Sequence, residues 1–256
     1  NSPDTVRVEN FKILRGNSSN GGGLYLNNSH VLAQNLDLSR HSSSENGGAV
    51  NLVLSSLKLK NSQIYLSSSE LHGGAISCVA SHVEVVNTDI YNNSSEMGGA
   101  IFVDPNSECI IDNVNFNNNG ANNGGAIATL EGSKLTVQDS EFTGNTASGF
   151  MQSNDPDCPV YGGGGAIYQA FSDTLKISNT NFFSNTANIS PGGAIASYHG
   201  VKILLYNVDI IDNESLGAGG GLAFFRTNNV TDVGGVIMNN RTSGNGGGGL
   251  FLGTES

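Results

Sequence analysis

Short stretches in which apolar and polar residues alternate recur along nearly the whole chain. The clearest copy is Leu175-x-Ile177-x-Asn179-Thr180-x-Phe182-x-x-Asn185. An alternation with a period of two is typical of β-strands that bury one face. The same frame fits seven further stretches, marked by Val6, Val8, Asn10 and Ile13; Val31, Ala33, Asn35 and Leu38; Leu57, Leu59, Asn61 and Ile64; Val83, Val85, Asn87 and Ile90; Cys109, Ile111, Asn113 and Phe116; Leu135, Val137, Asp139 and Phe142; and Ile203, Leu205, Asn207 and Ile210. A last copy is degraded: Val236-x-x-Asn239 is visible, but no upstream strand is clearly in register with it.

A glycine motif stands between these copies. It reads Gly-Gly-Ala-Ile at residues 124–127, and the third residue of each close copy lies at position 23, 49, 75, 100, 126, 166, 194, 221 or 249. Seven of the eight steps are 25 to 28 residues long, and the step from 126 to 166 is 40. A fixed period in this range predicts a solenoid, in which each repeat packs only against its neighbours.

Each repeat is expected to hold three short strands: one after the glycines, such as Ile127–Thr129, one at Leu135–Val137, and one that carries the Phe142 position. Three strands in about 26 residues form one turn of a parallel β-helix, whose copies stack about 4.8 Å apart. About nine turns give an all-β rod about 40 Å long. We expect a single domain over residues 1–256, with a loop insertion at about 146–162 where the long step falls. Both ends stop inside a repeat without a polar cap, which predicts a longer chain or ends that abut another subunit.

The repeats align residues into columns with different expected roles. Apolar columns that begin at Val6 and Ile13 should form the core, and the Ala after each glycine pair should point into a narrow part of it. A further column lies where the chain must bend between two strands, because Asn tolerates the left-handed backbone and its amide can bond the copies above and below. This predicted ladder consists of Asn10, Asn35, Asn61, Asn87, Asn113, Asp139, Asn179 and Asn207. The glycine motif does not predict phosphate binding, since it lacks the Lys of a P-loop and no helix follows it.

Composition removes several classes of function. The chain carries 22 acidic and 11 basic residues, a net charge of −11, which is a poor basis for binding nucleic acid. The sequence has no basic amphipathic helix and no run of eighteen apolar residues, so no direct membrane insertion is expected. Asn, Ser, Thr and Gly are plentiful, which suits tight turns and a neutral polar surface.

An outward column just before the Phe position is the main candidate for chemistry. It carries Asp37, Asp89, Glu141 and Asp209, with Gln63 and Asn115 between them. Carboxylates two turns apart are separated by about 9.6 Å at the backbone, whereas glycosidase carboxyl pairs lie roughly 5 to 9.5 Å apart. This is a spaced stripe rather than a tight pair, and the five histidines (His30, His41, His72, His82 and His199) share no single column. We therefore expect no catalytic residues and no cofactor.

The insertion and the cysteines leave alternatives open. Asp155 and Asp157 are candidate calcium ligands, since hard cations take carboxylate oxygens; the alternative is a tolerated surface excursion. Cys78 and Cys109 fall in inward columns and are most simply buried thiols, with a disulfide between them as the alternative. Cys158, in the insertion, is the odd cysteine, and its candidate partners are another chain or a segment outside the given sequence. No cysteine spacing suggests zinc.

The glycine motif together with Phe-x-x-Asn, at Phe116–Asn119, Phe142–Asn145 and Phe182–Asn185, resembles the polymorphic membrane protein repeat of chlamydiae. Similar repeats occur in large secreted proteins of other bacteria, archaea and algae. The resemblance covers roughly residues 6 to 252, although three glycine motifs have Gly in place of Ala. It implies a right-handed, single-stranded parallel β-helix displayed outside the cell, often as the passenger of an autotransporter that acts in adhesion.

These patterns predict an extracellular or cell-surface, non-enzymatic repeat protein, either an adhesin-like passenger or a structural rod of a surface appendage or filament. The alternative is a polysaccharide-degrading β-helix enzyme, a lyase or glycoside hydrolase. Expected partners are protein or glycan surfaces, and further copies or neighbouring segments joined end to end. If the source is eukaryotic, outward sequons would carry N-glycans; the candidates are Asn17, Asn27, Asn92, Asn93, Asn213, Asn229 and Asn240, whereas the sequon at Asn188 is followed by Pro191.

Overall fold

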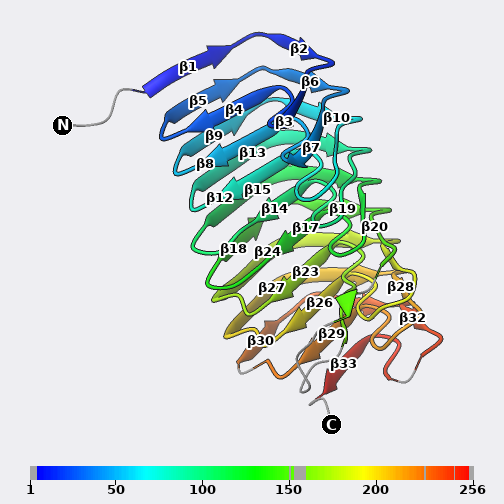
Figure 1. Cartoon of the computed structure of the whole chain (residues 1–256). Coiled ribbons are helices and arrows are strands. Elements are labelled where there is room, and N and C mark those ends of the chain that lie inside the picture. Colours follow the sequence, from blue (N-terminus) through cyan, green and yellow to red (C-terminus); the bar gives the residue numbers. More distant parts are fainter. Residues whose placement is uncertain (1–4, 150, 153–159, 228, 245, 254–256) are drawn as a thin grey trace.

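The chain winds into a parallel β-helix whose turns stack along one axis, with the first and last turns at opposite ends (Figure 1). The structure is a computed structural model and describes residues 5–149, 151–152, 160–227, 229–244 and 246–253. The described residues contain no helix, and so none long and apolar enough to cross a membrane. The predicted all-β parallel β-helix of about nine turns is confirmed.

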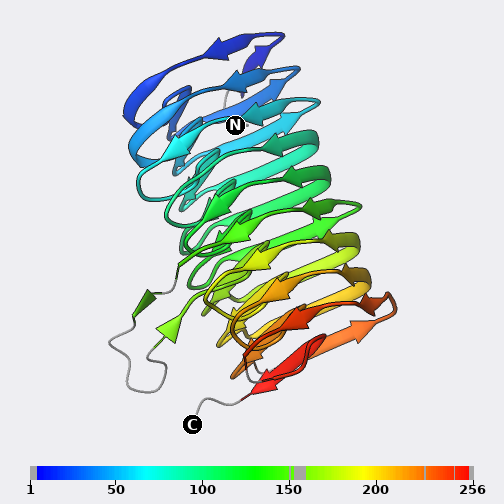
Figure 2. The same ribbon diagram turned by 90° about the vertical axis from the view of Figure 1, so that its right-hand side faces the viewer.

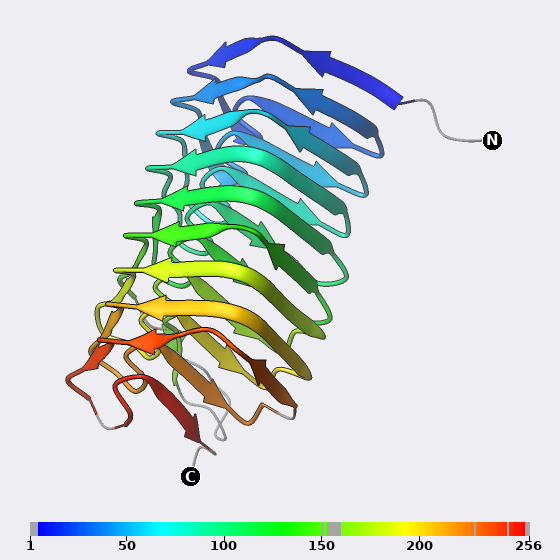
Figure 3. The same cartoon turned by 180° about the vertical axis from the view of Figure 1, so that it is seen from behind.

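The long sheet has fourteen strands and supplies two faces of the rod. Its first face consists of β1 (Thr5–Glu9), β5 (His30–Gln34), β9 (Ser56–Lys60), β13 (His82–Tyr91), β15 (Glu108–Asn117), β18 (Lys134–Gln138), β24 (Thr174–Phe183), β27 (Lys202–Ile211) and β30 (Val230–Val233). The second face adds β2 (Lys12–Leu14), β6 (Asp37–Ser39), β10 (Gln63–Tyr65), β19 (Glu141–Thr143) and β31 (Ile237–Met238). In β13, β15, β24 and β27 one strand runs across the bend between the two faces (Figure 3).

Each strand of the second sheet begins at the last residue of a glycine motif. Its nine strands are β4 (Leu24–Asn27), β8 (Val50–Val53), β12 (Ile76–Val79), β14 (Ile101–Val103), β17 (Ile127–Thr129), β23 (Ile167–Ala170), β26 (Ile195–Tyr198), β29 (Leu222–Phe225) and β33 (Leu250–Gly253). Two short sheets precede the glycines, formed by β3 (Asn17–Asn20), β7 (Ser42–Asn46) and β11 (Ser68–Ser69), and by β16 (Gly120–Ala121), β20 (Thr146–Ala147), β25 (Thr186–Ala187), β28 (Glu214–Ser215) and β32 (Arg241–Thr242). These short strands are a fourth element of the turn that the apolar pattern did not predict.

Sterics explain the glycine pair. Gly124 has a φ of 62°, in the left-handed region that favours glycine. A Cβ on Gly125 would fall on the backbone oxygen of Gly165 in the next turn, far inside van der Waals contact. The Ala that follows, Ala126, is fully buried, as expected from the sequence. The motif therefore turns the chain sharply and lets neighbouring turns approach closely.

The core fills the space between the sheets with stacked apolar columns. Strand register places Phe116, Phe142 and Phe182 on one line, and their rings stack with centroids 4.6 and 4.7 Å apart. Register likewise joins Val83, Cys109 and Leu135 in the column that begins at Val6. Each side chain thus completes the burial of its copies one turn away, which a single turn cannot do.

A buried asparagine ladder lies at the corner after the Phe column. It consists of Asn93, Asn119, Asn145, Asn185, Asn213 and Asn240. Asn145 is typical: its Oδ1 accepts from the backbone N–H (3.0 Å) and Nδ2 (3.1 Å) of Asn119, while its Nδ2 donates to the Phe116 carbonyl (3.0 Å). A strand that bends loses backbone partners, and buried polar groups need replacements. We call this column the inner ladder.

The interruption of the repeat is shorter than the expected loop at 146–162. Thr146 and Ala147 form β20 and pair in regular register with the turns on both sides. Ser148 and Gly149 still donate to the carbonyls of Ala121 and Asn122, so the regular turn extends to Gly149. Within the interruption β21 (Met151–Gln152) and β22 (Val160–Tyr161) pair antiparallel and project away from the stacked turns (Figure 2). Gly163 rejoins the regular pairing opposite Asn123.

The frame of the last repeat differs by one residue from the sequence prediction. Ile237, rather than Val236, pairs with Ile210 in the Phe column. Asn240, rather than Asn239, accepts the backbone N–H of Asn213 at 2.9 Å. The upstream strand missing from the pattern is β30, whose residues are all exposed; without burial it carries no clear apolar alternation.

Candidate functional site

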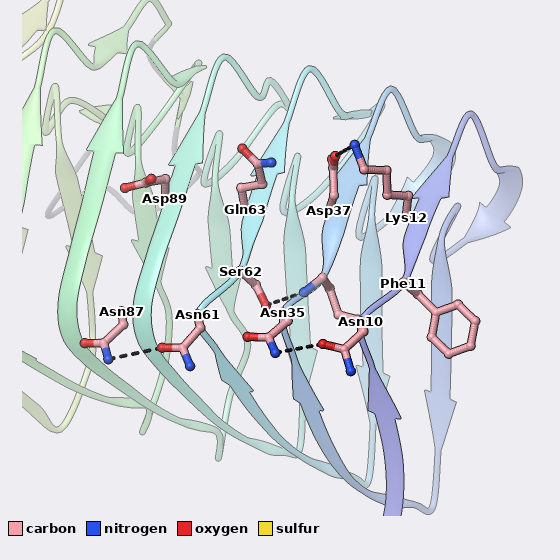
Figure 4. A pocket seen from close by; sticks show the side chains of 11 residues that line it. Asn10, Phe11, Lys12, Asn35, Asp37, Asn61, Ser62, Gln63, Asn87 and Asp89 are labelled. Carbon is pink, nitrogen blue, oxygen red and sulfur yellow. Dashed lines mark hydrogen bonds and ion pairs between the residues drawn. The ribbon is translucent and has the colours of Figure 1, made fainter.

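An open groove follows the bend of the long sheet through the first four turns (Figure 4). It has a volume of about 660 Å³. Its lining residues are Asn10, Phe11, Lys12, Asn35, Leu36, Asp37, Asn61, Ser62, Gln63, Asn87 and Asp89. The groove brings together two columns that the sequence singled out separately, the predicted asparagine ladder and the acidic stripe.

The first wall is the exposed asparagine column, here called the outer ladder. Its eight members all have φ between 47° and 59°. Amide hydrogen bonds join successive turns, as in Asn35 Nδ2 to Asn10 Oδ1 at 2.8 Å and Asn113 Nδ2 to Asn87 Oδ1 at 2.9 Å. Asp139 accepts from Asn179 at 3.0 Å but has no amide hydrogen to donate to the turn before it. The outer ladder therefore fixes the bend while its side chains stay in solvent.

The second wall is the outward column two residues further along each turn. Strand register gives its order as Lys12, Asp37, Gln63, Asp89, Asn115, Glu141, Asn181 and Asp209. From Asp37 onward, carboxylates and amides alternate strictly. The amide at Asn181, which the sequence analysis left out of the stripe, completes this alternation. We call this column the acid–amide column.

Electrostatics explains the alternation. Adjacent copies in a parallel sheet lie about 4.8 Å apart, and like charges at that distance destabilise a sheet. An interposed amide is uncharged and can donate to a carboxylate, as Asn115 Nδ2 does to Asp89 Oδ1 at 2.8 Å. At the first turn, Lys12 pairs with Asp37 at 3.2 Å. The carboxylates are thus about 9.6 Å apart along the backbone, as the sequence predicts.

The groove floor is buried and its polar groups are satisfied. Leu36 is 2% exposed, and its backbone N–H donates to Ser62 Oγ at 3.0 Å. Ser62 Oγ in turn donates to the Lys60 carbonyl at 2.7 Å. A floor held in this way gives the groove a fixed shape.

Two tyrosines lie beyond the acid–amide column. Tyr65 and Tyr91 stack with centroids 4.9 Å apart and ring planes within 4°, and Tyr91 donates to Gln63 Oε1 at 3.5 Å. The pKa of Tyr91 is raised, mainly by burial and to a smaller extent by the nearby Tyr65 and the carboxylates of Asp37 and Asp89. The phenol therefore remains a protonated donor at neutral pH.

Metal candidates gain no support from the described part of the chain. Asp155, Asp157 and Cys158 lie outside the described residues. Among the residues that the structure describes, no group of three or more His, Cys, Asp or Glu side chains is placed to hold a metal ion.

Cys78 and Cys109 are both buried and free, which confirms the thiol interpretation over the disulfide. Burial raises the pKa of the Cys78 thiol to about 12, and burial also raises the pKa of Cys109 well above its usual range. Neither thiol is a candidate nucleophile, since the thiolate is the reactive form.

The expectation that the sequons face outward is wrong for two of them. Asn93 and Asn213 are 1% and 0% exposed, because both belong to the inner ladder. Asn240 is half-buried and donates to the Ile210 carbonyl at 2.7 Å. Asn17, Asn27, Asn92 and Asn229 are exposed.

Two of the five histidines share a column. His30 and His82 lie on the first face of the long sheet with Ser56 between them. His82 Nδ1 lies 3.1 Å from Glu108 Oε2, and His30 Nδ1 lies 2.7 Å from Ser56 Oγ. The two imidazoles therefore have separate partners.

A family model described as a right-handed β-helix region matches residues 1–163, which is more than half of the chain. It agrees with the handedness expected from the sequence resemblance and does not distinguish the chlamydial type of repeat. Neither the comparison with curated proteins nor the comparison with solved structures gave a match.

Proposed function

The chain belongs to the right-handed β-helix family, and from this premise we propose that it is a non-enzymatic repeat protein of the cell surface or extracellular space. It would serve as an adhesin-like passenger or as a structural rod. The observation that carries this proposal is the recurrence of the same polar side chains on one face, turn after turn, in the outer ladder and the acid–amide column.

Repetition favours recognition or spacing over catalysis. A catalytic site needs a few groups that differ from their surroundings and act on one bond. Here Asp89 and Glu141, two turns apart, have the same environment, with an amide in register on each side. A surface of this kind offers many equivalent contacts to a long partner.

The mechanical design supports the same proposal. Parallel pairing continues from β1 to β30 in the long sheet and from β4 to β33 in the second sheet. Stacked side chains such as Phe116 and Phe142 tie each turn to the next. A continuous core without a hinge gives a stiff spacer.

Further parts of the proposal concern surroundings and partners. We propose protein or glycan partners along the rod and, at its ends, a further β-helix turn from a second copy or a neighbouring segment, as in a filament. The end turns expose apolar side chains, including Val6 at one end and Leu252 at the other, which another turn would cover. No cofactor is proposed. The exposed sequons at Asn17, Asn27, Asn92 and Asn229 are the proposed glycan acceptors if the source is eukaryotic.

A polysaccharide-acting enzyme is the second candidate. The groove favours it, because Asp37 and Asp89 both line that open cavity. Their separation of about two strand spacings, roughly 9.6 Å, lies at the wide limit for a pair of inverting carboxyl groups. The two candidates therefore differ in whether a bound glycan is cleaved.

Two measurements test the proposal. Immunogold electron microscopy on cells of the native source should place the protein at the surface, as tethered rods for an adhesin or as packed rods for a filament. Incubation with a panel of polysaccharides, followed by assays for new reducing ends and unsaturated products, should show no turnover. Turnover that is lost in both Asp37→Asn and Asp89→Asn would instead establish the enzyme, and an intracellular label would contradict the surface proposal.

A further inference from the structure

We propose that the groove along the outer ladder binds an extended glycan of neutral or amino sugars, lying parallel to the rod axis. This inference rests on the proposed function and deepens it by naming the class of partner. It stands on the lining of the groove, the unused hydrogen-bonding capacity of that lining, its repeat distance and its charge.

The outer ladder has hydrogen-bonding capacity to spare. Each amide has two N–H donors and an oxygen with two lone pairs. The bond from Asn35 to Asn10 uses one donor and one lone pair, and these side chains are exposed. Each asparagine of the outer ladder can therefore offer both a hydrogen-bond donor and an acceptor to a ligand in the groove.

The opposite wall matches the chemistry of hydroxyl groups. Asp89 presents acceptor oxygens, and the neighbouring Gln63 presents an amide that both donates and accepts. A sugar hydroxyl also both donates and accepts. Vicinal hydroxyls can therefore bridge a carboxylate on one turn and an amide on the next.

The spacing suits a polymer. The outer ladder repeats about every 4.8 Å along the axis, which is close to the length of one sugar residue in an extended glycan. Four turns line the groove, so successive sugars of a short oligosaccharide would meet equivalent amides of the outer ladder on one wall, and Lys12, Asp37, Gln63 and Asp89 in turn on the other. At one end the exposed ring of Phe11 offers an apolar surface for the C–H face of a sugar (Figure 4).

The charge of the lining selects among glycans. Asp37 is paired with Lys12, whereas none of the ion pairs of the described residues includes Asp89. The chain as a whole carries a net charge of −11. This negative charge would repel uronic-acid and sulfated glycans. It would not repel neutral sugars, and it would attract protonated amino sugars.

Preorganisation makes side-on binding favourable. The outer ladder holds its amides by bonds between turns, and the floor at Leu36 and Ser62 is buried. Side chains that are already ordered lose little entropy when a ligand binds.

Isothermal titration of the purified chain with tetrasaccharides of four kinds tests the inference. The probes are a β-1,4-glucan, an N-acetylglucosamine oligomer, its deacetylated amino-sugar form and a galacturonate oligomer. At least one of the first three should bind, and the galacturonate should bind at least tenfold more weakly. Asp89→Ala should weaken binding by about tenfold, because it removes a charged acceptor. Glu70→Ala, which removes an exposed carboxylate outside the groove, should leave binding unchanged.

The inference is overturned if none of the first three oligomers binds, if the galacturonate binds as well as they do, or if Asp89→Ala and Glu70→Ala behave alike. Circular dichroism and the thermal midpoint of both variants verify that the fold is intact. Cleavage of a bound oligomer would refute the non-enzymatic function while supporting the groove as the glycan site. Surface display without glycan binding would refute this inference alone.

Discussion

The Nε2 atom of His41 lies 2.8 Å from the carbonyl oxygen of Ile13, and through this contact an imidazole takes over a role that asparagine has in later turns. Asn119 in the inner ladder donates to the Ile90 carbonyl at 2.9 Å in the same way. His41 Nδ1 also accepts the backbone N–H of Gly16 at 3.0 Å. One ring nitrogen must donate while the other accepts, so only the neutral imidazole satisfies both partners.

Acidification should therefore lower the stability of the first turn. Burial lowers the pKa of His41 from 6.5, opposed by its bond to the Ile13 carbonyl. Below pH 6.5 the unfolded chain binds this proton more readily than the folded chain, so the free energy of unfolding decreases as the pH falls. This loss begins near pH 6.5 and ends at the lowered folded pKa. Hydrogen exchange at the Gly16 amide, measured by NMR at pH 7.5 and 5.5 and corrected for the intrinsic rate, should show weaker protection at the lower pH.

His41→Asn is the matched control for this prediction. Asparagine already fills the equivalent position of later turns, as at Asn93. The variant should keep the protection of Gly16 at pH 7.5 and lose most of its dependence on pH. An equal pH effect in the variant would show that another group is responsible.

The two asparagine ladders should differ strongly in their contribution to stability. Asn145→Ala would take the acceptor from the Asn119 N–H and the amide donor from the Phe116 carbonyl in a buried corner, while Asn185 Oδ1 keeps the backbone N–H of residue 145. At about 1–3 kcal/mol for each unsatisfied group, we expect a loss of roughly 3–5 kcal/mol, measured by urea denaturation.

Asn113→Gly provides the comparison in the outer ladder. Asn113 is exposed and has a φ of 53°, which glycine adopts without strain. Removing its exposed hydrogen bonds should cost less than about 1 kcal/mol. Similar losses for Asn145→Ala and Asn113→Gly would contradict the distinction between a buried and an exposed ladder.

The columns of the long sheet could be predicted from the sequence because alternation along a strand decides directly which side chains face inward. The columns of Val6 and Ile13 follow this rule, and strand register confirms them. The same reasoning failed at the last repeat, where Ile237 and its neighbours are exposed and burial no longer imposes the pattern.

The buried corner was harder to predict. Phe-x-x-Asn was visible in the sequence as a motif, yet the local pattern does not say whether Asn145 faces solvent or the interior. That depends on which backbone groups of the neighbouring turn lose their partners at the bend, as the Asn119 N–H does. The repetition of Asn once per turn at this position was the signal that could have revealed the inner ladder. His41 departs from that repetition and could not be assigned from it.

The acid–amide column should lose its electrostatic balance if an amide becomes a carboxylate. Gln63→Glu would place three carboxylates, Asp37, Glu at position 63 and Asp89, on successive turns. Repulsion at about 4.8 Å should lower the free energy of unfolding at pH 7 by up to about 1 kcal/mol. The loss should shrink near pH 4, where carboxylates become protonated, and on addition of calcium. Urea titrations under these three conditions measure the effect.

Gln34→Glu controls for adding a negative charge elsewhere on the same sheet. Gln34 lies in register between Glu9 and Lys60, so the new carboxylate has one unlike neighbour. Its effect at pH 7 should be smaller than that of Gln63→Glu and insensitive to calcium. An equal loss in both variants would mean that net charge, rather than position in the column, sets the stability.

Adding a methyl group should lower the stability strongly at one glycine of a turn and hardly at all at another. In Gly125→Ala the new Cβ would collide with the backbone oxygen of Gly165 and the backbone of Thr146, which cannot move without separating two turns. We expect a loss above about 3 kcal/mol or local unfolding near this turn. In Gly120→Ala the nearest atom to the Cβ is the Thr146 oxygen at 3.9 Å, an ordinary contact, so the stability should change by less than about 1 kcal/mol. Thermal unfolding followed by circular dichroism compares the two variants. A Gly125→Ala protein as stable as Gly120→Ala would mean that the turns are not packed as closely as the glycine motif requires.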